Sequence, residues 1–419
     1  MLANILRDET LAPLGIKKIE WVKAHMPVVG LIEERFIKEQ PFKGLKIAMS
    51  IHLEAKTART ALMFKAAGAD VYVTGCNSLS TQDDVAAGLA SLGVHVYAWH
   101  ASTPQEYHAH LIAALSCKPN IIIDDGGDLT QILCDERADL AEELIGGGEE
   151  TTTGVMRLKA RAEQKKLAFP MVCVNDAQMK FMFDNRYGTG QSVWDGIMRT
   201  TNLIVASKVV VVAGYGWCGK GVSMRAKGMG ARVVVCEINP VRAVEAAMDG
   251  FAVMPMNDAA KIGDVFVTVT GCCDVITTEH IAAMKDGAVL CNAGHFNVEV
   301  AIAQMRNKAV KIYEARENIE AFVFDVNGRK KTVYILAQAK LVNLASGDGH
   351  PAEIMDMSFA LQALMAEYVA KNKGKLENTV QEVPKDIDLT VAKLKLKTMN
   401  ISIDALTERQ NEYIHSCNG

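Results

Sequence analysis

The sequence predicts an α/β protein with two doubly wound parallel sheets and a helical C-terminal tail. Three observations support this. Strand-like and helix-like stretches alternate up to a boundary near residue 190, a second alternation begins at residue 207, and a glycine-rich turn follows the first strand of that second set. Such alternation is typical of sheets with helices on both faces.

The elements of the first half follow one another in a regular order. Helical patterns are expected over 55–68 and 83–93, between apolar stretches. The stretches predicted to be buried strands are residues 46–51, 71–75, 95–99, 120–125 and 170–175.

The second half repeats the arrangement and then adds a hairpin and helices. Its predicted strands are residues 207–214, 231–237, 264–270 and 287–294. A β-hairpin is expected with Asn327-Gly328 at its turn, because this dipeptide favours the left-handed backbone that a tight hairpin needs. A helix is predicted over 350–372, and the chain beyond it is charged and helical in places.

Composition excludes several classes of protein. Of 419 residues, 49% are hydrophobic and 22% charged, which is typical of a globular chain. The net charge of -4 gives no electrostatic reason to bind nucleic acid or a membrane, and no apolar run approaches the roughly 20 residues that span a bilayer. The first residues mix charges with apolar groups and do not resemble a signal peptide. Ten cysteines without regular spacing predict reduced thiols and a cytoplasmic protein.

The glycine-rich turn has the pattern G-x-G-x-x-G, at Gly214, Gly216 and Gly219. It follows an apolar strand and precedes a helical pattern, which is the context of a Rossmann-like dinucleotide site. Glu237 ends the next strand, 23 residues after Gly214. A carboxylate there accepts ribose hydroxyls and repels a 2′-phosphate, so the pattern predicts NAD rather than NADP.

Polar clusters follow the predicted strands of the first half, where an α/β sheet binds its ligands. They are residues 50–57, 121–130, 147–154 and 174–185. Lys180 and Asp184 are four residues apart, so on a helix they share a face. Near an oxidised nicotinamide such a lysine could accept the proton of a substrate hydroxyl.

Structural interpretations of these clusters stay open. Asp125 and Asp128 are also suited to capping a helix, and Lys180 with Asp184 to forming a surface pair. His52 at a strand end could be a core histidine.

The motifs together resemble the adenosylhomocysteinase family over nearly the whole chain. In the family's order they are HLEAKTA, NSLSTQDD, DDGGDLT, EETTTG, VNDAQMKFMFDNRYG, VAGYGWCGKG, CNAGHFNVE and LVNLASGDGHP. The resemblance implies one domain for the substrate and one for NAD, with NAD held as an internal catalyst. The ribose 3′-hydroxyl is oxidised, homocysteine leaves from C5′, water adds, and the alcohol is restored. The reaction is reversible and requires no metal.

The resemblance also implies roles for individual residues. The catalytic residues would be His52, Asp125, Glu150, Lys180, Asp184 and His295. Lys180 would be the base for the oxidation, tuned by Glu150, which would hold the ribose hydroxyls. Asp125 and His52 would transfer protons at C4′ and at the leaving group, and the assignment between them stays open. Substrate-binding residues would be Glu54, Lys56, Thr57 and His350, the last near the purine.

The cofactor set implied by the resemblance is larger than the glycine turn. It comprises Thr151, Thr152, Thr153, Asn185, Gly214, Gly216, Trp217, Cys218, Gly219, Glu237, Thr270 and Asn343. The substrate domain would be 1–185 with 350–385, the NAD domain 186–349, and 386–419 a dimerisation and cofactor tail. The implied assembly is a homotetramer or homodimer.

The sequence departs from the family pattern at three places. The usual tail lysine and tyrosine that reach NAD in a neighbouring subunit are absent, and Asn297 replaces an aspartate. At the purine, Glu54 and Lys56 replace a threonine and a glutamate. On a strand, these two residues and His52 would share one face.

The purine substitution suggests a different base. Lysine only donates hydrogen bonds, which suits the C6 carbonyl of hypoxanthine, while Glu54 can accept from its N1–H. S-inosyl-L-homocysteine is therefore a candidate substrate beside S-adenosyl-L-homocysteine. Alternatively, Glu54 and Lys56 pair with each other. Two further alternatives are an ordinary NAD-dependent dehydrogenase and a nucleoside-binding protein without catalysis.

Overall fold

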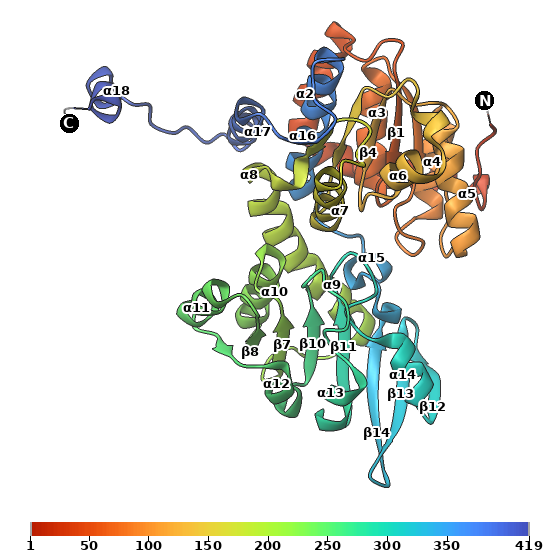
Figure 1. The fold of residues 1–419 in the computed structure, drawn as a ribbon, viewed down its shortest axis with the longest axis vertical. Coiled ribbons are helices and arrows are strands. Elements are labelled where there is room, and N and C mark those ends of the chain that lie inside the picture. Colours follow the sequence, from red (N-terminus) through yellow and green to blue (C-terminus); the bar gives the residue numbers. More distant parts are fainter. Residues whose placement is uncertain (1, 418–419) are drawn as a thin grey trace.

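The computed structural model describes residues 2–417 and has two sheets along the long axis of the molecule (Figure 1). The first has the order β15-β6-β5-β4-β1-β2-β3, and every neighbouring pair is parallel. Its strands are β1 (Lys46–Ser50), β2 (Asp70–Thr74), β3 (His95–Tyr97), β4 (Ile121–Asp124), β5 (Gly146–Glu149), β6 (Met171–Cys173) and β15 (Val380–Glu382). The five strands predicted in this half are confirmed.

Helices cover both faces of the first sheet, as its apolar strands predict. Ile47 and Met49 of β1 pack into one core, while Ala48 between them packs into another, because successive side chains of a strand point to opposite faces. The helices of this half are α1 (Ala12–Ala24), α2 (Pro27–Glu39), α3 (Ala55–Ala66), α4 (Asp83–Ser91), α5 (Pro104–Leu115), α6 (Asp128–Gln131) and α7 (Thr152–Glu163).

The second sheet has the order β12-β13-β14-β11-β10-β7-β8-β9. Its strands are β7 (Val209–Ala213), β8 (Arg232–Cys236), β9 (Ala252–Val253), β10 (Val265–Thr268), β11 (Ala288–Asn292), β12 (Lys311–Arg316), β13 (Ile319–Val326) and β14 (Arg329–Leu336). β13 and β14 are antiparallel, and Asn327 and Gly328 turn between them with φ of 55° and 79°. The predicted hairpin and α/β fold class are both confirmed.

The helices of the second unit also lie on both faces of their sheet. Val210 and Val212 pack toward α9 (Thr189–Thr201) and α10 (Trp217–Gly228), while Val209 and Val211 pack into the opposite core. The other helices are α11 (Pro240–Met248), α12 (Met256–Ile262), α13 (Thr278–Ala283), α14 (Ile302–Lys308) and α15 (Val342–Ala345). The boundaries predicted for the domains stay a prediction.

Strand β5 was not predicted, because it consists of three glycines and a glutamate, residues that are depleted in strands. The glycines are needed for packing. After the second unit, α16 (Ala352–Lys371) returns to the first sheet and lies directly on β5. A side chain at Gly148 would meet Gln362 and Met365, with Cβ 2.9 Å from Oε1 and 3.0 Å from Sδ.

The C-terminal tail is helical, as predicted. Its first helix packs against the first unit, where Val391 is part of the core, and residues 399–417 extend away from both sheets (Figure 1). The tail contains α17 (Lys385–Thr398) and α18 (Glu408–His415). Several of its apolar side chains are exposed: Met399, Ile401, Ile403, Leu406, Tyr413 and Ile414.

One local expectation is wrong. Glu54 and Lys56 do not lie on a strand with His52, because β1 ends at Ser50 and α3 begins at Ala55. Glu54 is the N-cap of α3, and its carboxylate accepts from the backbone N–H groups of Lys56 and Thr57 at 3.0 and 3.3 Å. A carboxylate satisfies the free N–H groups at the start of a helix well, which explains why α3 begins directly after Glu54.

The contact between β5 and α16 gives the first testable prediction. Gly148→Ala should lower the free energy of unfolding by about 1–3 kcal/mol, because the new methyl group overpacks Met365 and Gln362. Urea unfolding measures the change. Gly30→Ala is the matched control, because Gly30 lies in α2 and nothing lies within 4 Å of the position that its Cβ would take. Since alanine favours a helix more than glycine does, the free energy of unfolding of this variant should rise by up to about 1 kcal/mol. Equal stability of both variants would contradict the packing argument.

Candidate active site

A cavity lies where the carboxyl ends of the first sheet face the loops of the second unit. Its lining comprises Ile51, His52, Glu54, Lys56, Thr57, Asp125, Glu150, Thr151, Thr152, Lys180, Asp184, Asn185, Thr189, Cys218, Ala293, His295, Leu341, Asn343, Leu344, Gly349, His350, Met355 and Phe359. All ten residues that the sequence assigned to catalysis or substrate binding are in this set. Their roles stay predictions, but their convergence follows from the parallel sheet, whose strand ends meet at one edge.

Lys180 is the centre of the first polar group in the cavity. Its Nζ lies 3.3 Å from Asp184 Oδ1 and 3.9 Å from Glu150 Oε1, and it donates to Asn185 Oδ1 at 2.7 Å. All three charged side chains are buried. The predicted proximity of Lys180 and Asp184 is therefore confirmed, and the alternative of a surface pair is wrong.

Burial and neighbouring charge oppose each other in this group. Burial lowers the pKa of Lys180, but Asp184, Glu150 and Asp125 outweigh it and raise the pKa above its usual value. Burial alone would raise the pKa of Asp184, yet Lys180 and His350 bring it below the ordinary range. For Glu150 burial dominates and raises the pKa to about 8. The charged forms of Lys180 and Asp184 therefore stabilise each other, while burial favours the protonated form of Glu150.

Two side chains of α16 orient these carboxylates. Ser358 donates to Asp184 Oδ2 at 2.6 Å, and Gln362 donates to Glu150 Oε2 at 2.5 Å. Glu150 Oε1 is buried and has no hydrogen-bond partner among the described residues. This oxygen is available to a bound hydroxyl group.

His350 lies against Asp184, with Nδ1 3.0 Å from Oδ1. Its Nε2 lies 3.2 Å from the Thr189 hydroxyl. The histidine therefore joins the Lys180 group in this structure, and it lines the same cavity as Glu54 and Lys56.

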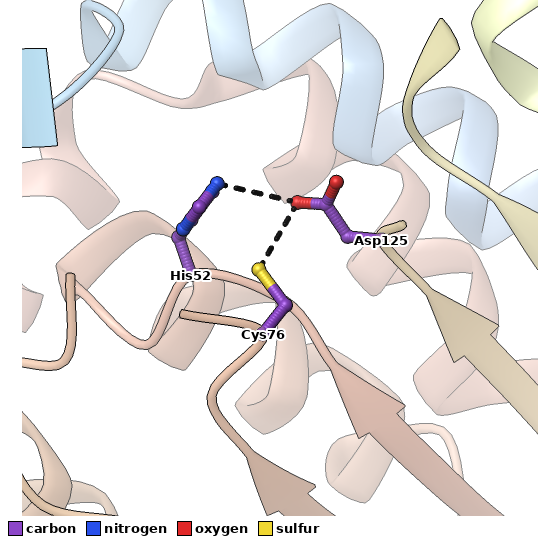
Figure 2. Close-up of side chains that lie close together, drawn as sticks. All are labelled: His52, Cys76 and Asp125. Atoms are coloured by element: carbon purple, nitrogen blue, oxygen red, sulfur yellow. Dashed lines mark hydrogen bonds and ion pairs between the residues drawn. The ribbon is translucent and has the colours of Figure 1, made fainter. Parts of the chain in front are cut away.

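A second polar group surrounds Asp125. His52 Nε2 lies 3.6 Å from Asp125 Oδ2, and His295 Nδ1 lies 3.7 Å from Oδ1. The Cys76 thiol donates to Oδ2 at 3.5 Å (Figure 2). His295 comes from the loop after β11, so this group joins the two units.

Burial favours the uncharged forms of the side chains in the Asp125 group. It lowers the pKa of His52 to about 3, aided by the charges of His350 and Lys56, and it lowers the pKa of His295. It raises the pKa of Asp125, although His295 and Lys180 oppose the shift. Two neutral imidazoles therefore flank a carboxyl group that binds a proton more readily than usual.

The remaining acidic residues near β4 are structural. Asp124 caps α6, accepting from the Thr130 N–H at 2.8 Å and from the Thr130 hydroxyl at 2.9 Å. Asp128 accepts from Tyr107 and Arg157 at 2.8 and 3.0 Å. The capping interpretation named Asp125 and Asp128, but among the described residues neither accepts a backbone N–H at the start of α6; Asp124 accepts from those of Leu129 and Thr130 instead. Gly126 has φ of 108°, and a side chain there would collide with His295.

At the other end of the cavity, Lys56 and Glu54 form a buried ion pair. Lys56 Nζ lies 2.6 Å from Glu54 Oε2 and donates to the Asp348 carbonyl at 2.7 Å. The pairing alternative from the sequence is therefore present. Because an ammonium group has three N–H donors, one remains for a ligand.

The predicted cofactor turn has the backbone that a dinucleotide needs. Gly214 has φ of 102°, and a side chain at Gly219 would collide with the Gly214 carbonyl. Glu237 follows β8 and accepts from the Tyr215 N–H at 2.7 Å and from the Ile238 and Asn239 N–H groups at 2.8 and 2.9 Å. A carboxylate has about four acceptor positions, so capacity remains for a ribose hydroxyl.

The twelve predicted cofactor residues divide into two sets by their position relative to the cavity. Those that line the cavity are Thr151, Thr152, Asn185, Cys218 and Asn343. Those that do not are Thr153, Gly214, Gly216, Trp217, Gly219, Glu237 and Thr270. Asn343 Oδ1 is buried without a hydrogen-bond partner in the described chain, which leaves an acceptor for a bound group. Thr270 is engaged by Glu299, whose carboxylate accepts from its hydroxyl at 2.7 Å.

Sequence reasoning missed several residues of the site. Cys76, Ser358 and Gln362 were not predicted, although each contacts a predicted catalytic carboxylate. Ser358 and Gln362 are four residues apart and therefore share a face of α16. Polar residues buried in an otherwise apolar helix were the available signal.

A dinucleotide turn beside a cavity with a buried lysine and carboxylates defines an NAD-dependent enzyme that acts on a hydroxyl compound. Residues 3–143 match the family model of S-adenosyl-L-homocysteine hydrolase, and residues 185–349 match the model of its NAD binding domain. The chain belongs to the S-adenosyl-L-homocysteine hydrolase family. NAD as the cofactor is thereby confirmed.

Curated relatives match the chain over nearly its full length. An S-inosyl-L-homocysteine hydrolase from Methanocaldococcus jannaschii is 55% identical over 409 residues, which is 98% of each chain. An adenosylhomocysteinase from Thermococcus kodakarensis is 54% identical over 98% of this chain and 97% of its own. Another from Thermotoga maritima is 53% identical over 96% of this chain and 99% of its own.

The raised pKa of Glu150 predicts how stability depends on pH. A group whose pKa rises on folding stabilises the fold below its unfolded pKa and loses this effect as pH rises through its folded pKa. Between pH 4.5 and 8, Glu150 should therefore reduce the free energy of unfolding by on the order of 4 kcal/mol, because a tenfold change in an ionisation constant is worth about 1.4 kcal/mol.

Glu150→Gln should flatten this part of the pH profile in urea unfolding at pH 5 and pH 8. Glutamine keeps the shape of the side chain and cannot ionise. Glu412→Gln, on the exposed helix α18, is the control, and its free energy of unfolding should depend on pH as that of the original protein does. An equally steep profile for Glu150→Gln would show that other groups cause it.

Proposed function

We propose that this protein hydrolyses the thioether of S-nucleosyl-homocysteines reversibly to L-homocysteine and a nucleoside, with NAD held as an internal cofactor. The observation that carries the proposal is the pair of buried polar groups, around Lys180 and around Asp125, in one cavity beside the dinucleotide turn. Curated relatives named for this hydrolysis support it.

The glycine turn, Glu237 and the free acceptor of Asn343 fit NAD. When bound, NAD supplies a reversible hydride acceptor for a substrate alcohol and one positive charge. A nearby positive charge lowers the pKa of an ammonium group. Lys180 can then release its proton, and its amine can accept the proton of the ribose 3′-hydroxyl.

Glu150 and Asp184 complete the binding of the ribose. Burial favours the protonated form of Glu150, and this form, with its free oxygen, can both donate to and accept from a hydroxyl group. Asp184 stays ionised and keeps Lys180 within 3.3 Å. Ser358 and Gln362 restrict both carboxyl groups to one orientation, which reduces the entropy lost on binding.

The Asp125 group is suited to the elimination that an ordinary dehydrogenase does not perform. Once C3′ is a carbonyl, the C4′ proton is acidic and the C5′–S bond can break. Asp125 accepts a proton more readily than a free aspartate and can take the one from C4′. His52 or His295 can relay a proton to the departing sulfur, and water then bonds to C5′ as the C4′ proton returns.

We propose hypoxanthine as the preferred purine. Within residues 2–417, Lys56 keeps one N–H for the C6 carbonyl, and Glu54 Oε1 accepts only the long bond from the Thr57 N–H, which leaves capacity for the N1–H. Three curated relatives at 51–55% identity are named S-inosyl-L-homocysteine hydrolases. Adenine, with its donor at C6, would place a donor against the ammonium group of Lys56.

We also propose a cytoplasmic homo-oligomer. All ten cysteines are free thiols, which suits a reducing compartment. No helix among residues 2–417 is long and apolar enough to cross a membrane. The exposed apolar residues of the tail suit burial against a second copy of the chain, as a homodimer or homotetramer.

The proposed reaction predicts release of a thiol. The full-length, NAD-loaded protein should release homocysteine thiol from S-inosyl- or S-adenosyl-L-homocysteine without net formation of NADH. Lys180→Met should slow this by roughly 10²–10⁴-fold, because it removes the proton acceptor. Lys159→Met, a surface lysine paired with Asp176, is the control and should keep full activity. Thiol from neither substrate would refute the proposal, and NADH formed in proportion to an oxidised alcohol would favour a dehydrogenase.

The purine assignment predicts a change of preference. The original protein should favour the inosyl compound, and Glu54→Thr with Lys56→Glu should reduce the ratio of kcat/KM values at least about tenfold toward the adenosyl compound. Threonine can still cap α3, so the helix should persist. Lys65→Glu, at the far end of α3, should leave the ratio unchanged. Preference of the original protein for the adenosyl compound would contradict the assignment.

A further inference from the structure

Three potential metal ligands meet in the Asp125 group, although no spacing in the sequence predicts a metal site. His52, Cys76 and Asp125 each offer a donor atom, and these atoms lie within 4.8 Å of one another (Figure 2). The residues follow β1, β2 and β4, which are neighbours in the sheet but distant in the chain. This explains why no short metal-binding motif is visible.

The distances in this group suit a tetrahedral ion. Zn²⁺ bonds of about 2.3 Å to sulfur and about 2.0–2.2 Å to oxygen or nitrogen imply ligand separations of roughly 3.3–3.6 Å. Cys76 Sγ lies 3.5 Å from Asp125 Oδ2, and His52 Nε2 lies 3.6 Å from the same oxygen. Two edges of such a tetrahedron therefore exist already.

The hydrogen bonds of His52 direct a lone pair toward the other two ligands. The Ser80 hydroxyl donates to the Asn77 carbonyl at 3.1 Å, so its oxygen accepts from His52 Nδ1–H at 2.8 Å. In a neutral imidazole, Nε2 is then unprotonated. A partner that fixes the far nitrogen is the usual support of a metal-bound histidine.

From this geometry we propose that His52, Cys76 and Asp125 bind one thiophilic divalent cation of the Zn²⁺ class, and that this cation inhibits the enzyme reversibly. A thiolate, an imidazole and a carboxylate are ligands that Zn²⁺ and Cd²⁺ take together, while Mg²⁺ prefers oxygen ligands alone. The thiol gives up its proton on binding. The inhibitory part of this proposal rests on the proposed function, because the ion would occupy the atoms that move protons in that reaction. Binding of the ion is independent of the proposed function.

Cadmium titration of the full-length, NAD-loaded protein without substrate tests the site. Three exposed thiols would also bind the ion, so the background carries Cys272→Ser, Cys273→Ser and Cys417→Ser. We expect the ultraviolet cadmium–thiolate absorption to saturate at one ion per chain. Adding Cys76→Ser should abolish it, and His52→Gln should weaken binding at least about tenfold. Cys117→Ser, whose thiol donates to the Ala114 carbonyl outside the cavity, is the matched control and should change neither.

Several outcomes would overturn the site. They are absence of the absorption at millimolar Cd²⁺, its persistence in Cys76→Ser, or an equal response to Mg²⁺. If Cys76→Ser does not fold, X-ray absorption of the Zn²⁺-loaded background protein decides, because the site requires one sulfur ligand and a shell of only nitrogen and oxygen refutes it.

Inhibition is measured separately as nucleoside formation by chromatography, because homocysteine itself binds Zn²⁺. One equivalent of Zn²⁺ should stop the reaction and a chelator should restore it. Full activity with the site occupied would overturn the inhibitory part. A protein that binds Cd²⁺ as described but cleaves no nucleosyl-homocysteine would refute the proposed function and leave the metal site standing.

Discussion

Burial of the Lys180 ammonium group is the constraint on which the rest of the site depends. An isolated cation in the interior costs several kcal/mol, so carboxylates must surround it. Asp184 lies on the segment that follows Lys180, whereas Glu150 and Asp125 come from the ends of other strands. In a parallel sheet those strand ends share an edge, so these groups come together without a long insertion. The compensation of one charge therefore requires the fold of the whole first unit.

The carboxyl groups around Lys180 also determine how α16 packs. Ser358 and Gln362 hold Asp184 and Glu150 from this helix, so α16 must lie close to β5. The glycines of β5 make the close approach possible, and Gly154 likewise leaves room for the buried Glu149 carboxylate. Weak strand propensity is thus tolerated where it allows polar groups to be placed accurately.

Much of this arrangement was predictable from sequence because it follows from local patterns. Apolar stretches indicated the principal strands, Asn327-Gly328 indicated a hairpin, and G-x-G-x-x-G with Glu237 indicated the cofactor turn. Strand β5 was not predictable, since its glycines are explained only by a helix that is distant in the chain. The cap formed by Glu54 was missed because alternation was extended past the end of β1. Cys76 lacked any pattern, as its partners are brought to it by tertiary folding alone.

The return of the chain to the first sheet has a mechanical consequence. The backbone passes between the two units twice, once through residues 181–201 and once through 336–352. Two bodies joined at two points keep essentially one rotational degree of freedom, about the line through both points. Lys56 and Gln82 contact Asp348, and Lys340 contacts Ser78, so the second crossing segment is fixed to the first unit by side-chain hydrogen bonds. Relative motion of the units would thus be guided along a single path, and His295, which the second unit carries, would return to the same place beside Asp125.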